Sequence, residues 1–183
     1  MPEDSDHITA IEDHIADVLR QDLPRLLPGA FEPALIGLYG GEFGTEDIIG
    51  TIDEMVSRGT HVLVSYMGGT EYDHNNTGEV GEGAAQFSVY VAGRNLRDES
   101  EQRRDVYPVV QSTRLIARMA QDTVISGSLG EASWQAKVGN LWPGEDSIVV
   151  SVPGVVCFQL EINCEVKVLW DLPNDLSELG NIG

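Results

Sequence analysis

The sequence predicts an α+β fold in which helices pack on one face of a mixed, mostly antiparallel sheet. Segments with helical periodicity are interspersed with segments of strict alternation, without regular β-α-β repetition. Several of the predicted strands are joined as hairpins. No internal repeat divides the 183 residues. We therefore expect a single domain over residues 1–170, followed by an acidic and flexible C-terminal tail over residues 171–183.

The first predicted element is an amphipathic helix near the N-terminus. It begins after Ser5 or Asp6, and apolar residues recur at three-and-four spacing along it. We expect it to extend to about Asp22, because Pro24 ends or kinks a helix.

A short strand over residues 34–39 is expected next, closed by two glycines. Thr45 has the character of an N-cap for a second, short helix, and Gly59 is a plausible stop. Residues 61–67 then form a strand that is apolar on both faces, which indicates a central position in the sheet.

Residues 68–83, "GGTEYDHNNTGEVGEG", carry five glycines in sixteen residues. This composition predicts a long mobile loop rather than a tight hairpin. It is a candidate assembly loop, with Gly68, Gly69, Tyr72, Asp73, His74, Gly78, Gly81 and Gly83 as its candidate residues.

The next strand is expected over residues 87–92 and a third helix from about Asp105 to Gln121, with Pro108 in its first turn. After the helix the chain reads as strands and turns. Residues 131–139 and 147–152 are predicted strands, separated by a turn at Pro143 and Gly144.

The last strand, residues 156–168, is the clearest element. Period two is sustained over thirteen residues, so one face is core and the other is wet or contacts a partner. Cys157 and Cys164 lie an odd number of residues apart and about 23 Å along the strand. We expect them to point to opposite faces as buried thiols, with no disulfide between them.

The chain has a formal net charge of −19 and a sequence pI near 4.3. That balance argues against sequence-independent binding to DNA and against docking on anionic lipid. No apolar run approaches the roughly 20 residues of a membrane span. The N-terminal residues lack a signal-peptide pattern, so we expect the protein to stay in the cytosol after synthesis.

No sequence motif indicates an enzyme or a cofactor. The phosphate-loop, zinc-protease and nucleophile-elbow patterns are absent. His7 and His14 share a helix face and could form a metal pair, although flanking histidines are far commoner. Residues 71–76, "EYDHNN", lack the layout of a calcium loop. We expect no catalytic residue, no cofactor and no metal.

Six of the eleven Lys and Arg residues lie between Arg94 and Arg118. We call Arg94, Arg97, Arg103 and Arg104 the arginine cluster, and we expect most of these residues to lie in a loop. It is either a solvated loop paired with nearby carboxylates or a contact surface for the acidic face of another subunit. Its candidate interface residues are Arg94, Asn95, Arg97, Arg103 and Arg104.

Four segments together resemble a known family. They are "ITAIEDHIADVL" (8–19), "FSVYVAGRNLR" (87–97), the helix to Gln121 and "VCFQLEINCEVKV" (156–168). In these the chain resembles the Mu-like phage and prophage tail-completion proteins, considered tail terminators or neck proteins and encoded between head-completion and tail-sheath genes. The resemblance covers about two thirds of the chain, and its motifs are short and not catalytic.

The resemblance implies a structural protein that assembles as a ring of identical subunits, a hexamer in this class. Such a ring caps the tail tube, joins tail to head and contacts tube, sheath and head-connector proteins. It would form in the host bacterial cytoplasm and end in the virion neck. DNA would pass through without sequence-specific binding, and a carboxylate-lined lumen would repel it. Alternatives are a head-completion adaptor, a monomeric ligand-binding module or an unrecognised hydrolase.

Overall fold

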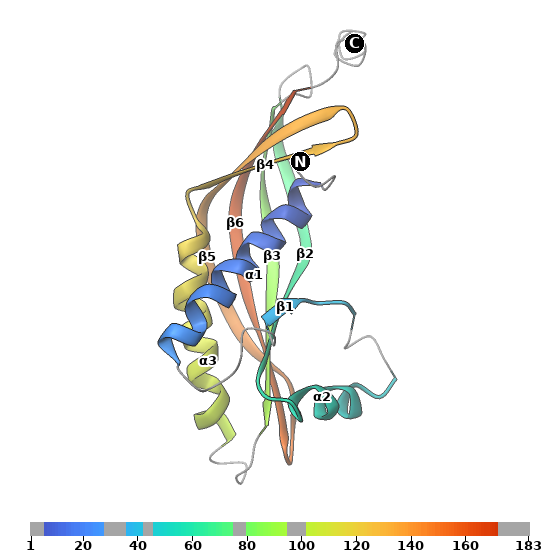
Figure 1. The fold of residues 1–183 in the computed structure, drawn as a ribbon, viewed down its shortest axis with the longest axis vertical. Helices are drawn as coiled ribbons and strands as arrows, with labels where there is room; N and C mark the ends of the chain where they lie inside the picture. Colours follow the sequence, from blue (N-terminus) through green and yellow to red (C-terminus); the bar gives the residue numbers. More distant parts are fainter. Residues whose placement is uncertain (1–5, 28–35, 42–45, 75–79, 95–101, 172–183) are drawn as a thin grey trace.

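The computed structural model describes residues 6–27, 36–41, 46–74, 80–94 and 102–171. The described strands form one six-stranded sheet in the order β1-β2-β3-β6-β5-β4. β1 pairs with β2 in parallel, and every other neighbouring pair is antiparallel. The predicted α+β class with a mixed, mostly antiparallel sheet is confirmed. Figure 1 shows the sheet curling around helix α1.

The central strand, β6, keeps the predicted alternation over its whole length. Its even-numbered side chains from Val156 to Val168 are buried in the main core, on what we call the inner face of the sheet. Odd-numbered side chains from Gln159 onward define the outer face. The strands are β1 Ile36–Leu38, β2 His61–His74, β3 Val80–Arg94, β4 Thr123–Leu129, β5 Ala132–Val152 and β6 Val155–Asp171.

Helix α1, His7–Leu26, lies across the inner face (Figure 1). Asp6 caps it, because its carboxylate accepts hydrogen bonds of 2.9 Å from the N–H groups of Ile8 and Thr9. Partial burial opposes the charged form of Asp6, but the bonds from Thr9 and Ile8 outweigh it and lower its pKa. Pro24 lies inside the helix, which extends beyond the predicted end at Asp22.

Helix α3, Gln102–Ala117, packs on the same inner face and continues into a short 3-10 turn, Arg118–Ala120. Its buried side chains are those that the periodicity predicts: Val106, Val109, Val110, Thr113, Ile116 and Ala117. The helix begins before the predicted Asp105. It approaches β3 closely at Gly93, where an added Cβ would lie 2.5 Å from Val106 Cγ2.

Helix α2, Ile48–Val56, departs from the prediction that the helices share one face. Its buried Ile52 and Val56 pack with Ala92, Val155 and Cys157, whose side chains lie on the outer face. The periodicity of α2 identifies an apolar stripe but not the face of the sheet that it covers. Asp47 is its N-cap and accepts from the Gly50 N–H at 2.9 Å, whereas the predicted cap, Thr45, lies outside the described residues.

β5 is one continuous strand where the sequence predicts two strands and a turn. It pairs with β6 from Ser133 to Val152 and absorbs three irregularities in register. Pro143 and Gly144 fall within the strand, because the register shift between Pro143 and Asp146 accommodates them as a bulge. The predicted turn is therefore wrong.

The two cysteines lie on opposite faces of β6, as predicted. Cys164 belongs to the inner core and Cys157 to the smaller cluster beneath α2. Both are buried and free, so no disulfide joins them. β6 ends at Asp171, and the predicted C-terminal tail lies almost wholly outside the described residues.

Candidate functional site

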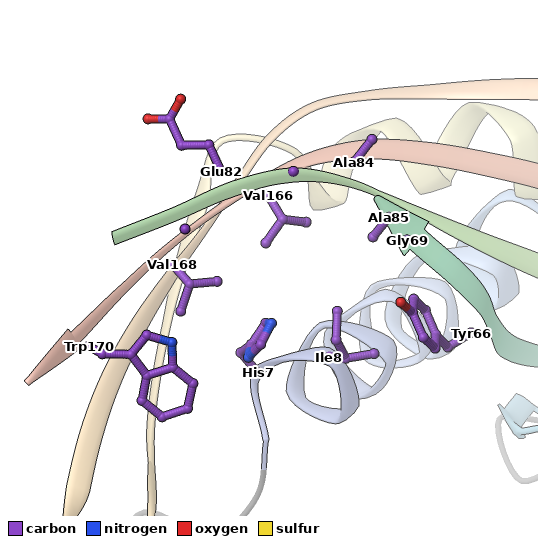
Figure 2. Close-up of a pocket in the computed structure, with 12 residues that line it drawn as sticks. His7, Ile8, Tyr66, Gly69, Glu82, Ala84, Ala85, Val166, Val168 and Trp170 are labelled. Atoms are coloured by element: carbon purple, nitrogen blue, oxygen red, sulfur yellow. The ribbon is translucent and has the colours of Figure 1, made fainter. Parts of the chain in front are cut away.

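A groove of about 280 Å³ opens on the inner face, between the start of α1, the second half of β2, the start of β3 and the end of β6 (Figure 2). Its walls are mostly apolar. Val166 and Val168 point into it from β6, and Trp170 lies at one end. The remaining lining side chains include His7 and Ile8 of α1 and Tyr66 of β2.

The groove exists because glycines replace side chains on its floor. Gly69, Gly81 and Gly83 all line it. An added Cβ at Gly69 would lie 2.8 Å from Tyr66 Oη and 2.9 Å from the Ala84 carbonyl oxygen. The register shift between Tyr66 and Gly68 lies beside this floor.

These glycines correct the prediction of a mobile loop over residues 68–83. Gly68, Gly69, Tyr72, Asp73 and His74 belong to β2, whereas Gly81 and Gly83 belong to β3. Gly78 lies outside the described residues. The glycines serve bulges and a close approach between elements. The length of the final strand indicated that residues 80–86 extend the neighbouring strand, because a long β6 needs an equally long partner in β3.

His7 lies between two tryptophans at the end of the groove. Its ring centroid is 6.2 Å from that of Trp134 and 5.9 Å from that of Trp170, both in edge-to-face geometry. Glu82 points away from the groove (Figure 2) and pairs with Lys167 on the outer face. The groove thus offers one imidazole among apolar walls, which suits an apolar or aromatic group better than acid–base chemistry.

The described members of the arginine cluster lie at the other end of the sheet from the groove. Arg94 is exposed at the end of β3, and Asn95 and Arg97 lie outside the described residues. Arg103 and Arg104 are in the first turn of α3 rather than in the predicted loop. The structure thus divides the cluster between a strand end and a helix start.

Of the two basic residues that follow the cluster, one has a structural partner. Arg114 is half-buried and pairs with Asp146, and it also donates to the Gly144 carbonyl oxygen at 3.4 Å. This contact ties α3 to the bulged part of β5. Arg118 is exposed.

Among the residues that the structure describes, no further strand pairs with either edge of the sheet over much of its length. β4 is one edge strand, and among the described strands it pairs with β5 alone. At the other edge β1 covers only Val62–Val64 of β2. Sequence analysis missed β4, although its β-branched residues "TVISGSL" were a signal.

The outer face beside β4 carries the only two lysines of the chain. Lys137 and Lys167 are directly paired across β5 and β6, and Lys167 bonds to Glu82 of β3. Like charges in this position repel each other, so the Glu82 carboxylate offsets part of that repulsion.

The predicted metal alternative for His7 and His14 receives no support from neighbouring ligands. Within the described ranges, no group of three or more His, Cys, Asp or Glu side chains could hold a metal ion. Burial lowers the pKa of His14 and keeps its imidazole neutral near pH 7.

No helix in the described part of the chain is both long and apolar enough to span a membrane. Comparisons of the chain with protein-family models and with curated proteins find no match.

Proposed function

We propose that the protein is a structural phage assembly protein, a tail terminator or tail-completion protein. It forms a ring at the head-proximal end of the tail tube and joins the tail to the head. Its partners are further copies of itself, the tube, the sheath and the head connector. Assembly takes place in the host bacterial cytoplasm, and the ring becomes part of the virion neck.

The resemblance on which this proposal rests falls on the central elements of the fold. "ITAIEDHIADVL" lies in α1, "FSVYVAG" in β3 and "VCFQLEINCEVKV" in β6. These elements pack on one another in the main core, where Ile15, Val89 and Leu160 are fully buried. The matching text therefore covers residues that determine the fold, and not only surface segments.

The observation that carries the proposal is the pair of open sheet edges. A monomer normally protects its edge strands with charge, proline or a covering element. β4 contains no charged residue and no proline, and its Val124 and Leu129 are 59% and 51% exposed. Two different sheet edges without a strand partner in the described part of the chain support head-to-tail association, which closes into a ring when the rotation allows.

The charge of the chain is compatible with a conduit for DNA. With a net charge of −19 the surface repels phosphate, so DNA can pass without binding. The basic side chains at the end of β3 and the start of α3 then find acidic partners on neighbouring subunits.

A ligand-binding module is the second candidate, because the glycine-floored groove is large enough for a small apolar group. The two functions predict different behaviour of the purified protein. A ligand-binding module stays monomeric and gains thermal stability from an apolar compound, whereas a ring protein associates with rising concentration.

Electron microscopy of phage that lack the protein, combined with light scattering of the purified chain, tests the proposal. We expect tails of irregular length that do not join to heads, and restoration by the wild-type protein. Normal tails beside heads that leak DNA would instead indicate the head-completion adaptor. Complete infectious particles without the protein would overturn the proposal.

A further inference from the structure

We infer that the ring interface is a strand addition, in which β4 of one copy pairs in parallel with the free upper part of β2 in the next copy. The inference rests on the proposed function, because it names the contact by which the ring forms. The occupant of each edge is a second copy of this chain.

The direction of the strands makes this pairing possible. From β2 to β4 each step across the sheet is antiparallel, through β3, β6 and β5. Four reversals leave β2 and β4 running in the same direction at the two edges. A rotation about an axis parallel to the strands therefore brings β4 beside the neighbour's β2 in parallel, and repeated rotation closes a ring.

Within the described residues, the edge of β2 has one part that is paired with β1 and another that no strand covers. Its lower part is paired with β1, and the Tyr39 N–H donates to the Val64 carbonyl oxygen at 2.7 Å. Two residues after Val64 along β2, the Glu12 carboxylate accepts a hydrogen bond from the Tyr66 N–H. Residues 67–74 continue beyond this cap, and these eight residues are enough to pair with all seven residues of β4.

The lateral register places opposite charges on the two sides of the contact. One row of paired residues crosses the sheet as Val124, Lys137, Lys167, Glu82 and Asp73. The row has lysines on β5 and β6, next to β4, and acidic residues on β3 and β2. When the row continues into the next copy, Val124 is in register with the neighbour's Asp73, so the lysine positions of β5 and β6 lie on one side of the new strand pair and the acidic positions of β2 and β3 on the other.

Charge substitutions at the edge test the inference. Val124→Glu adds a carboxylate beside the acidic end of the neighbour's row, so we expect the midpoint concentration of assembly to rise at least tenfold. Val124→Lys should raise it much less, because lysine faces that acidic end favourably. Leu115→Glu on α3 is the matched control, since Leu115 and Val124 are equally exposed at 59%.

Light scattering across a concentration series gives the midpoints, and thermal melts verify that each variant is folded. We expect Leu115→Glu to assemble as the wild type does. Wild-type assembly by Val124→Glu, or an equal loss in Leu115→Glu, would overturn the inference.

Cysteine cross-linking tests the pairing even if a charge variant fails to fold. The double variant Val124→Cys with Asp73→Cys should form a ladder of oligomers under oxidation, ending in a closed species. Neither single variant should cross-link. Dimers from Val124→Cys alone would show that β4 pairs with β4 and would overturn the inference.

The same experiment separates this inference from the proposed function. Rings that form in solution but never cross-link between β4 and β2 would overturn the strand pairing and leave the ring function standing. A chain that stays monomeric both alone and on isolated tail tubes would overturn both.

Discussion

The carboxylate of Glu12 on α1 accepts a hydrogen bond of 2.5 Å from the backbone N–H of Tyr66, 54 positions later on β2. A side chain of the helix thereby occupies the edge of the sheet at the point where β1 has ended. Burial raises the pKa of Glu12, the Tyr66 N–H lowers it, and the charges of Asp13 and Asp6 raise it further, with a net increase.

Replacement of Glu12 by alanine should destabilise the protein by about 1 kcal/mol, the typical net contribution of one hydrogen bond, because the N–H of Tyr66 loses the Glu12 acceptor. Glu12→Gln keeps an acceptor oxygen and removes the charge, so its loss should be smaller. Urea unfolding at pH 7 measures both variants, and an equal loss in the two would contradict a specific role of the hydrogen bond.

The pH dependence of the Glu12→Gln variant should differ from that of the wild type. Because the folded-state pKa is raised, the stability that Glu12 contributes is fully present below its unfolded pKa of about 4.3 and is lost as pH rises through the folded value. The free energy of unfolding of the variant should therefore increase relative to that of the wild type as pH rises from about 4 to 7. Urea midpoints that shift in parallel over this range would contradict the raised pKa.

Gly127→Ala should destabilise the protein by about 1–3 kcal/mol, as overpacked cores do. An added Cβ would lie 2.3 Å from Cζ2 of the fully buried Trp134. Gly37→Ala in β1 is the matched control, because no atom lies within 4 Å of the added carbon there. Urea unfolding followed by near-UV circular dichroism measures both, and a similar loss in the two would contradict the packing argument.

The thiols of Cys157 and Cys164 should resist thiol reagents until the protein unfolds. Burial raises the pKa of each to about 12, so neither forms a thiolate near neutral pH. A colorimetric thiol assay should detect no rapid reaction in buffer and two thiols in denaturant. Rapid labelling of the native protein would mean that β6 opens readily.

Charge reversal at Arg94 and Arg97 should weaken assembly and leave the stability of the monomer within about 0.5 kcal/mol, as for most surface changes. Arg118→Glu is a control, since Arg118 is exposed but lies at the opposite end of α3. Light scattering reports assembly. Unchanged assembly in the double variant would mean that these arginines make no contact between subunits.

The sequence predicts best those elements whose period is set by a single buried face. α1, α3 and β6 each pack against the same inner core, so their apolar spacing reports burial directly. Cys157 and Cys164 follow from the same rule, because an odd separation in a regular strand places them on opposite faces.

The mistaken predictions share a physical cause, which is pairing between segments far apart in the chain. Gly68 and Gly81 look like loop residues locally, yet the neighbouring strands hold them in register. Pro143 likewise reads as a turn but lies in a bulge of β5. The groove and the open edges depend on such long-range pairing, so no local pattern could indicate them.

The three bulges of β5 have a consequence for the curvature of the sheet. Between the shared ends of their pairing, Ser133 with Asp171 and Val152 with Val155, β5 has three residues more than β6. At about 3.3 Å per residue this is roughly 10 Å of additional contour. Two ribbons of unequal length joined along their sides must bend, as the two metals of a thermostat strip do. The difference in residue number between β5 and β6 thus sets the curvature of the sheet. Insertion or deletion of single residues in β5 is the simplest way to change that curvature.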